Sequence, residues 1–329
     1  MAYTTIDAPE ADFQLVGYTG TGSSQAVSLP GDTNLSPDLV IIKGRVATST
    51  TSWFDTVRGA TKQIATSRIG GNAQGTVAES LKSFDSDGFT VGTDGDVNYD
   101  GDTYMGHCLK ESADSGFDIV SYTGTGSAHT ISHSLSAVPD WYAVKELDNS
   151  GSWYTFTQTT GNEQSMFLNG TNIVADASSG YWNSTSPTSS VFSVGTNGGI
   201  NQSSTGYIAY LFRSIQGFSK FGTYTGNNNA DGAFVWTGFR PAFVVVKAYT
   251  TNTEGWMMFD KVRNPHNIVD KYYTMEGTGG DSTRDTIDFL SNGFKPRIAN
   301  TDCNNDDYIY MAFADQPFVN SNGVPNNAR

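Results

Sequence analysis

Short apolar runs set between polar turns dominate this chain, and the clearest is "PDLVIIK" at residues 37–43. It is apolar between an opening Pro-Asp and a closing lysine, which favours a strand that is buried on both faces. The proline fits this interpretation, because the first residue of a strand need not donate a ladder hydrogen bond. Related runs, "PDWYAVK" at 139–145 and "PAFVVVK" at 241–247, follow at intervals of 102 residues.

A second kind of run alternates from residue to residue. In "YIAYLFR", at residues 207–213, Ile208, Tyr210 and Phe212 face one side of a predicted strand, and the residues between them face the other. Both sets are mostly apolar, so we expect both faces of this strand to be covered. Runs of this kind begin at Tyr104, Tyr207 and Tyr308.

The turns repeat together with the strands. "GYTGTGSSQAVSL" at residues 17–29 returns as "SYTGTGSAHTISH" at 121–133, and the Tyr-Thr-Gly step occurs again at Tyr224. The recurrence of the same landmarks in the same order indicates a repeated unit of about a hundred residues. The sequence therefore predicts an N-terminal arm at 1–12, repeats at 13–114, 115–215 and 216–314, and a C-terminal tail at 315–329.

These features predict an all-β protein made of three tandem β-sandwich or jelly-roll-like repeats. Short strands, frequent glycine turns and aromatic residues at 12% suit such units. One stretch breaks the pattern, because "TKQIATSR" at residues 61–68 alternates poorly and is expected to hold one or two helical turns. The tail is rich in Asn, Pro and Gly, and we expect it to form no strand.

Charge and cysteine content exclude several classes of protein. The 329 residues carry a formal net charge of -14 without a run of Lys or Arg, so nucleic acid is not an expected partner. No apolar stretch is long enough to cross a membrane and the first residues lack a signal core, so we expect synthesis in the cytoplasm without membrane insertion. Cys108 and Cys303 are too few for a disulfide framework and are expected to be free thiols.

An acidic loop is the strongest candidate for metal binding. "DGDVNYDGD", at residues 94–102, alternates oxygen-bearing side chains with other residues, and Ca²⁺ binds about six to eight oxygens. The glycine and glutamate of an EF-hand loop are missing from their positions, so the alternative is an acidic turn before the closing strand. The candidate calcium ligands are Asp94, Asp96, Asn98, Asp100 and Asp102.

Catalytic groups are harder to find in this sequence. The four histidines occupy different positions in the three repeats, and no G-x-S-x-G motif accompanies them. Carboxylate pairs for glycoside hydrolysis could exist among the 33 acidic residues, but their separation is not visible in a sequence. "GYTGTGS" lacks the lysine and the following helix of a phosphate-binding loop. We therefore expect no enzymatic activity, and no cofactor other than calcium at the acidic loop.

Lys43, Lys145 and Lys247 end the three apolar runs. We expect each aliphatic stem to lie on apolar surface with its ammonium in water. A tryptophan soon follows each lysine, and packing beneath a loop is a more frequent role for it than stacking on a sugar. Trp182, in the polar segment "SSGYWNSTS", is the better candidate for an exposed receptor contact.

The chain resembles a known family along its whole length. Its segments "MAYTTID", "FDIVSYTGTGSAHTISHSLSAVP" and "AFADQPFVNSNGVPNNAR" are similar to repeat-built virion structural proteins of tailed bacteriophages, common in marine phages. The resemblance implies a non-enzymatic, β-rich and exposed component of the virion, and it supplies no catalytic residues. The third repeat has Ala242 where the others have Asp38 and Asp140, so features of one repeat do not transfer directly to the next.

The expected function is that of a tail-fibre or tail-tip component that contacts a receptor on the host surface. The alternative is a capsid decoration or head-fibre protein that binds capsid subunits, and a polysaccharide depolymerase comes third. The expected partners are other virion proteins and a host-surface glycan or protein. A homotrimer is expected, because several copies increase avidity and closed symmetry is the usual form of a homo-oligomer.

Overall fold

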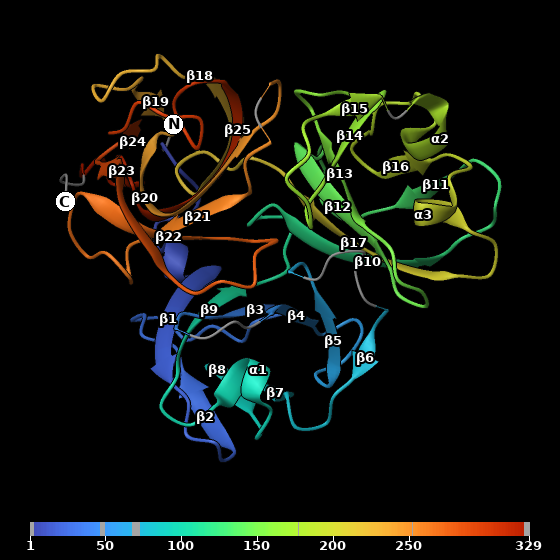
Figure 1. The fold of residues 1–329 in the computed structure, drawn as a ribbon, viewed down its shortest axis with the longest axis horizontal. Helices are drawn as coiled ribbons and strands as arrows, with labels where there is room; N and C mark the ends of the chain where they lie inside the picture. Colours follow the sequence, from blue (N-terminus) through green and yellow to red (C-terminus); the bar gives the residue numbers. More distant parts are fainter. Residues whose placement is uncertain (1–2, 47–49, 68–72, 177, 252, 326–329) are drawn as a thin grey trace.

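Antiparallel strands make up most of the protein. The computed structural model describes residues 3–46, 50–67, 73–176, 178–251 and 253–325. Its strands form antiparallel sheets with only short helices between them, and Figure 1 shows three lobes. The prediction of an all-β protein is confirmed. None of the described helices is long and apolar enough to cross a membrane.

The first lobe, residues 13–109, contains a large and a small sheet. The large sheet has the strand order β1-β9-β3-β4-β5-β6, and the small sheet has the order β2-β8-β7. A short 3-10 helix, Pro9–Ala11, precedes them. The elements are β1 (Phe13–Thr19), β2 (Gln25–Ser28), β3 (Leu39–Gly44), β4 (Thr51–Asp55), β5 (Lys62–Ala65), β6 (Gly75–Thr76), β7 (Leu81–Asp85), β8 (Gly88–Val91), α1 (Gly95–Asn98) and β9 (Thr103–Leu109).

The second lobe, residues 117–212, has a large sheet with the same arrangement of strands and a smaller second sheet. Its large sheet has the order β10-β17-β12-β13-β14-β15, and its small sheet pairs β11 with β16. The elements are β10 (Phe117–Thr123), β11 (His129–Ser132), β12 (Trp141–Glu146), β13 (Trp153–Thr157), β14 (Gln164–Phe167), β15 (Ala175–Asp176), α2 (Ser178–Trp182), β16 (Val191–Val194), α3 (Gly198–Asn201) and β17 (Gly206–Phe212).

The third lobe, residues 219–317, joins its strands into one sheet. The order is β18-β25-β20-β21-β22-β23-β24-β19. Lys220 of β18 donates a hydrogen bond to the Trp236 carbonyl of β19 at 3.0 Å, so a side chain links the two edge strands and the sheet is nearly closed. The elements are β18 (Ser219–Thr225), β19 (Val235–Trp236), β20 (Phe239–Ala248), β21 (Met257–Asp260), β22 (Val269–Thr274), β23 (Ser282–Leu290), β24 (Gly293–Pro296) and β25 (Asp307–Pro317).

The central strand of each large sheet is buried on both faces, as its continuous apolar run predicts. In β3, Leu39 and Ile41 face the centre of the molecule, whereas Val40 and Ile42 pack inside the first lobe. Successive side chains of a strand point to opposite faces, so an unbroken apolar run supplies two cores at once. The closing strand β17 alternates as predicted, with Tyr210 toward the centre.

Side chains from all three lobes pack in one central core. The ring of Phe13 in the first lobe lies 4.8 Å from that of Phe313 in the third lobe, measured between centroids. Phe313 lies 6.1 Å from Phe212 of the second lobe, and Trp53 of the first lobe lies 5.0 Å from Trp153 of the second. Burial of apolar area is the main source of folding free energy, so this core ties the stability of each lobe to the other two.

Equivalent backbone contacts close the three lobes into a ring. In each case a backbone N–H of one lobe donates a hydrogen bond to a backbone carbonyl of the next lobe. The acceptor lies two residues after the lysine that ends the central apolar run of that lobe. The bonds run from Gln74 to Leu147 at 2.7 Å, from Val174 to Tyr249 at 3.1 Å and from Asp281 to Arg45 at 2.7 Å. The last of them joins the third lobe to the first, which no direct chain connection links.

Two local predictions are wrong. Residues 62–65 form strand β5 instead of a helical turn, because Ile64 pairs with Trp53 and is buried in the central core. Arg68, at the end of the predicted helical stretch, lies outside the described residues. Strand β25 continues through Pro317, three residues into the predicted tail, since Phe239 pairs with Pro317 across the sheet.

The two chain ends pack together on the third lobe. Thr4 donates a hydrogen bond to the Gln216 carbonyl at 2.8 Å, and the Tyr3 hydroxyl donates to the Gly238 carbonyl at 2.9 Å. The backbone N–H of Ser321 donates to the Asp7 carboxylate at 2.7 Å. Residues of the predicted arm and tail therefore hold each other in place.

Candidate functional site

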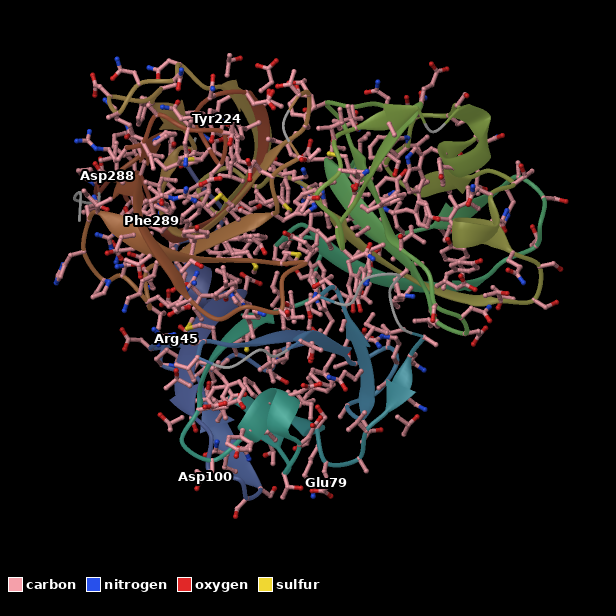
Figure 2. All side chains as sticks on the ribbon, in the orientation of Figure 1. Arg45, Glu79, Asp100, Tyr224, Asp288 and Phe289 are labelled. Atoms are coloured by element: carbon pink, nitrogen blue, oxygen red, sulfur yellow. The ribbon has the colours of Figure 1, made fainter. Side chains whose placement is uncertain are left out.

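The acidic loop does not gather the predicted calcium ligands. Asp94 accepts a hydrogen bond from the Asp96 N–H and so caps the one-turn helix α1. Asn98 is buried, whereas Asp100 is exposed at the outer end of the first lobe (Figure 2) and Asp102 is half-buried. The helical turn breaks the alternation that would have brought these side chains together in an extended loop. In the described chain, no group of three or more His, Cys, Asp or Glu residues could hold a metal ion.

The polar groups of this turn form a tyrosine–asparagine lock, made in the first lobe by Tyr18, Tyr104 and Asn98. The two rings stack with centroids 5.2 Å apart, and the hydroxyls donate to the carbonyls of Val97 and Gly95. The Asn98 amide donates to two carbonyls and its oxygen accepts from a backbone N–H. The same lock is made by Tyr122, Tyr207 and Asn201, and by Tyr224, Tyr308 and Asn304.

Trp182 is not an exposed contact, and that prediction is wrong. Its side chain is 0% exposed, and its ring meets the Tyr142 ring edge-on at 5.0 Å in the core of the second lobe. The indole N–H donates to the Gln164 carbonyl at 3.1 Å. Helix α2 directs the side chain inward even though the sequence around it is polar.

The three lysines that end the central runs are buried, so the prediction that their ammonium groups lie in water is also wrong. Lys43 donates to the Gly277 carbonyl of the third lobe at 2.8 Å, and Lys247 donates to the Thr171 carbonyl of the second lobe at 3.0 Å. Burial lowers the pKa of all three lysines to about 8. Carbonyl groups of the adjoining lobe replace water for two of these ammonium groups.

The tryptophans that follow the lysines lie in the same seams between lobes. Trp153 is fully buried and its indole N–H donates to the Ala65 carbonyl of the first lobe at 3.0 Å. Trp256 is fully buried and donates to the Phe167 carbonyl of the second lobe at 2.9 Å. These two indole side chains stabilise the contacts between lobes and are not accessible for stacking on a sugar.

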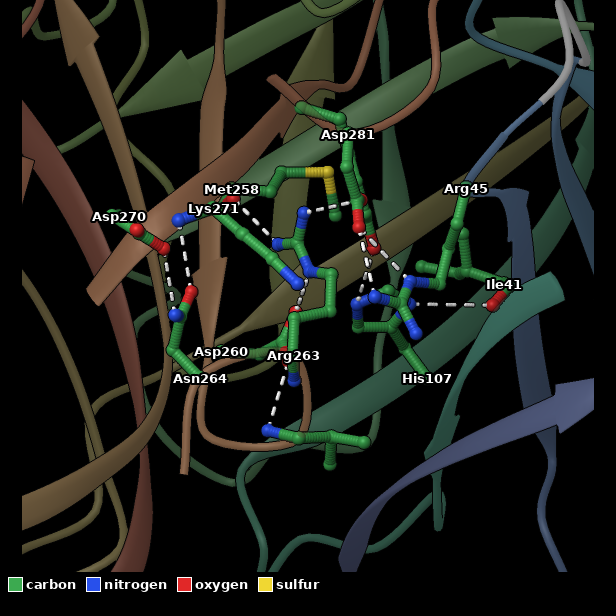
Figure 3. Close-up of polar contacts among 12 residues, drawn as sticks. Ile41, Arg45, His107, Met258, Asp260, Arg263, Asn264, Asp270, Lys271 and Asp281 are labelled. Atoms are coloured by element: carbon green, nitrogen blue, oxygen red, sulfur yellow. Dashed lines mark hydrogen bonds and ion pairs between the residues drawn. The ribbon is translucent and has the colours of Figure 1, made fainter. Parts of the chain in front are cut away.

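A charged network fills the seam between the third and first lobes (Figure 3). Arg263 pairs with Asp260 and also contacts Asp281, which binds Arg45 of the first lobe at 2.9 Å. Burial opposes the charge of Asp260, but Arg263 outweighs it and holds the pKa of the carboxyl below its ordinary value. Every charge in this network has an opposite partner, as burial of ions requires.

His107 lies in the same seam and is neutral. It is fully buried, and burial lowers the pKa of its imidazole to about 4. Its Nδ1 contacts the Ile41 carbonyl at 3.4 Å, and the Tyr273 hydroxyl lies 3.2 Å from Nε2. A carbonyl can only accept, so Nδ1 carries the proton and Nε2 accepts a hydrogen bond from the tyrosine hydroxyl. A base that is sealed from solvent and held between two fixed partners suits a structural role better than proton transfer to a substrate.

Both cysteines are free thiols, as predicted, and both are buried. Burial raises the pKa of the Cys303 thiol to about 12, and it raises that of Cys108 as well. A thiol must ionise to attack a substrate or bind a metal ion. Neither cysteine is therefore prepared for such chemistry.

A polar groove of about 380 Å³ separates the first lobe from the third. Gln14 of the first lobe and Lys261 and Asp315 of the third line it. The Asp315 carboxylate pairs with both Lys261 and Arg240. These three charged side chains therefore pair with one another at the edge of the groove.

The strongest candidate for a contact site is an exposed aromatic edge on the third lobe, formed by Phe234, Trp236 and Lys220. Phe234 is 49% exposed and Trp236 is 50% exposed, whereas Val235 between them is buried. The Lys220 ammonium lies 4.1 Å from the centroid of the Trp236 ring. Lys220 belongs to β18 and Trp236 to β19, and Figure 1 places these two strands beside each other on the outside of the lobe.

The other two lobes have small residues at the corresponding positions of this edge. Val27 of β2 and Ile131 of β11 are the buried residues of strands that pair as β19 does, and their neighbours are Ala26 and Ser28, and Thr130 and Ser132. Those strands fold without large aromatic side chains, so folding does not require them in β19. The segments that follow the three Tyr-Thr-Gly steps differ in this respect in the sequence itself, since large aromatic residues occur in the third segment where the other two have small residues. Charged and nucleophilic residues, which the sequence predictions were based on, do not indicate this edge.

Comparison with known proteins gives a family but no function. A family model described as a domain of unknown function, DUF7483, matches residues 8–317. Neither the curated proteins nor the solved structures contain a significant match. The match covers all three lobes.

Proposed function

The chain belongs to the DUF7483 family, and we propose that it is a non-enzymatic structural protein of a tailed-phage particle that contacts the host surface. The observation that carries the proposal is the combination of a ring of lobes, joined by a shared core and by seam hydrogen bonds, with the exposed aromatic edge of the third lobe. Polar and charged groups of the interior support the ring, while Phe234 and Trp236 stand outside it. Large exposed aromatic residues are typical of binding surfaces, where they contribute strongly to affinity.

The three lobes are proposed to be copies of one repeated unit, with the boundaries 13–114, 115–215 and 216–314. Equal strand registers support this proposal, since Phe13 pairs with Leu109, Phe117 with Phe212 and Ser219 with Phe313 at the start of the first strand of each lobe. The recurring tyrosine–asparagine lock supports it as well. The lobes surround a shared core, so the proposed repeats would form a ring and not a linear stack.

A tail-fibre or tail-tip position is the leading proposal, because in the described parts of the lobes the aromatic edge belongs to the third lobe and has no equivalent at the corresponding positions of the other two. A protein that binds equivalently through three lobes would need the same surface on each, and the other two have small residues there. Such an edge suits contact with a receptor on the host surface. Other virion proteins would bind the rest of the surface of the chain.

A capsid decoration protein is the second candidate, and the ring favours it. Three similar lobes around one axis match the symmetry of a three-fold position on an icosahedral shell. A single chain would then supply the three contacts that a homotrimer of smaller chains would otherwise provide. The expected homotrimer is a separate proposal, which light scattering on the purified chain would test.

Labelling of intact particles tests the function. Antibodies against the chain, detected with gold in electron micrographs, are expected to mark the tail. Labelling confined to the head would replace the leading proposal with the decoration protein. Particles that contain the chain neither by labelling nor by mass spectrometry would contradict both.

A further inference from the structure

We propose that the aromatic edge binds an acidic saccharide, with Phe234 and Trp236 against the apolar faces of the sugar and Lys220 paired with its carboxylate. The inference rests on the proposed function of the edge as a contact site and names the chemistry of its ligand. It follows from two independent features of these residues, their exposure and their charge.

The first feature is the pair of exposed rings. Phe234 directly precedes β19 and Trp236 ends it, so the two residues flank Val235 in the chain. Val235 points into the lobe and packs in its core. Both aromatic side chains are about half exposed at this edge, and aromatic side chains supply contact area with little loss of side-chain freedom on binding. Sugar rings carry apolar C–H faces that such surfaces accommodate.

The second feature is an unneutralised cation. The Lys220 ammonium donates to the Trp236 carbonyl and lies over the Trp236 ring. Among the described residues, no carboxylate forms an ion pair with it, and burial is the cause that lowers its pKa. The neighbouring Lys295 and Arg297 both have Asp231 as a partner. A partly desolvated cation beside two apolar rings is complementary to a ligand that offers a carboxylate together with an apolar face.

A second copy of the acidic chain is the competing occupant, because it would also offer carboxylates. The saccharide is favoured, since two exposed aromatic side chains with one cation form a small surface compared with the area that a stable protein interface buries. The two occupants predict different behaviour. Self-association depends on protein concentration, whereas saccharide binding does not require a second copy.

Calorimetric titration of the full chain with tri-galacturonic acid tests the proposal, and its methyl ester serves as a neutral ligand of the same shape. The acid is expected to bind at least about tenfold more tightly than the ester. Lys220→Gln should reduce binding of the acid to the level of the ester, and Trp236→Ala should weaken both. Ser132→Ala, at the corresponding position of the second lobe, is the control and should leave binding unchanged. Thermal unfolding of each variant verifies that it is folded.

Several outcomes would overturn the proposal. Equal affinity for acid and ester would remove the role of Lys220, and absence of any binding would remove the site. Self-association that Trp236→Ala abolishes would make a second copy the occupant. If the chain does not bind the saccharide but antibodies still label the tail, the proposed function stands and only the saccharide proposal fails. If the chain binds the saccharide but is absent from the particle, only the proposed function is contradicted.

Discussion

At the scale of single residues, burial decides the role of a polar side chain more than its identity does. Asn98 and Asp100 stand two positions apart in the same acidic loop, yet the first is buried in the tyrosine–asparagine lock and the second is exposed. A buried amide must have its hydrogen bonds satisfied within the protein. The lock meets this requirement three times with the same residue types.

Replacement of Asn98 tests the lock. Asn98→Ala leaves the Ser23 and Gly92 carbonyls and the Thr21 N–H without their partner, and should lower the free energy of unfolding by about 3 kcal/mol. Asp100→Ala, in the same loop, should change it by less than about 0.5 kcal/mol. Urea unfolding of the two variants measures both values. Equal effects would show that the lock is not the source of stability.

His107 gives the protein a predicted sensitivity to acid. Its pKa is about 4 in the folded chain and about 6.5 in the unfolded chain, so the unfolded state takes up a proton first as the pH falls. Stability from this group is present above pH 6.5 and decreases by about 3 kcal/mol on the way to pH 4. Burial is the main cause of the lowered pKa, because the attraction of Asp260 for the protonated ring exceeds the repulsion from Arg263.

The variant His107→Gln is the matched test, because glutamine can keep a donor and an acceptor in the seam without titrating. Unfolding by urea at pH 7, 5.5 and 4 should show a smaller loss of stability in the variant than in the original chain. If the two pH profiles run parallel, His107 does not titrate as proposed.

At the scale of elements, the turn after β1 depends on a close approach of two backbones. A Cβ atom placed on Gly20 would lie 2.2 Å from the Tyr99 carbonyl oxygen. Gly124 and Gly226 have equally close backbone neighbours in the other lobes. The Tyr-Thr-Gly step therefore recurs because the tyrosine belongs to the lock and the glycine lets the turn pack against it.

Replacement of this glycine is expected to disrupt the turn. Gly20→Ala should destabilise the protein by at least about 2 kcal/mol, since backbone on both sides must move to admit the methyl group. The control is Gly95→Ala in the adjacent helix α1, where the nearest atom would lie 3.6 Å away and the effect should stay within about 0.5 kcal/mol. Thermal unfolding of both variants distinguishes them, and similar melting temperatures would contradict the packing argument.

At the scale of the whole molecule, the lobes are coupled through one core and three seams. Phe313 contacts Phe13 of the first lobe and Phe212 of the second. A lobe that separated from the ring would expose its part of the central core and break buried contacts such as that of Trp256 with the second lobe. Independent unfolding of one lobe is therefore unfavourable.

Calorimetry should consequently show one unfolding transition for the chain. The calorimetric and van't Hoff enthalpies are expected to agree, as they do for a cooperative unit. Phe313→Ala should shift this single transition as a whole to lower temperature. Removal of a buried aromatic ring lowers the free energy of unfolding by about 3 to 5 kcal/mol. Separate transitions for the three lobes, in the original chain or in this variant, would contradict the coupling.

The sequence by itself determined the all-β class, the central and closing strands, and the free thiols. These follow from local patterns, because the spacing of apolar residues shows directly which faces of a strand are buried. "PDLVIIK" and "YIAYLFR" could be interpreted without knowledge of their neighbours. The helical turn predicted around Ile64 was wrong because a partner strand, β4, overrides the weak local preference of that segment.

Only the tertiary structure decided which polar and aromatic residues are buried and which are exposed. Trp182 has polar neighbours in sequence and lies in a core, while Phe234 and Trp236 adjoin an apolar strand residue and lie outside. Lys43 ends an apolar run, but its ammonium meets a carbonyl of another lobe. The surroundings of Trp182 and Lys43 depend on segments that are distant in sequence, so the residues beside them in the chain do not show them.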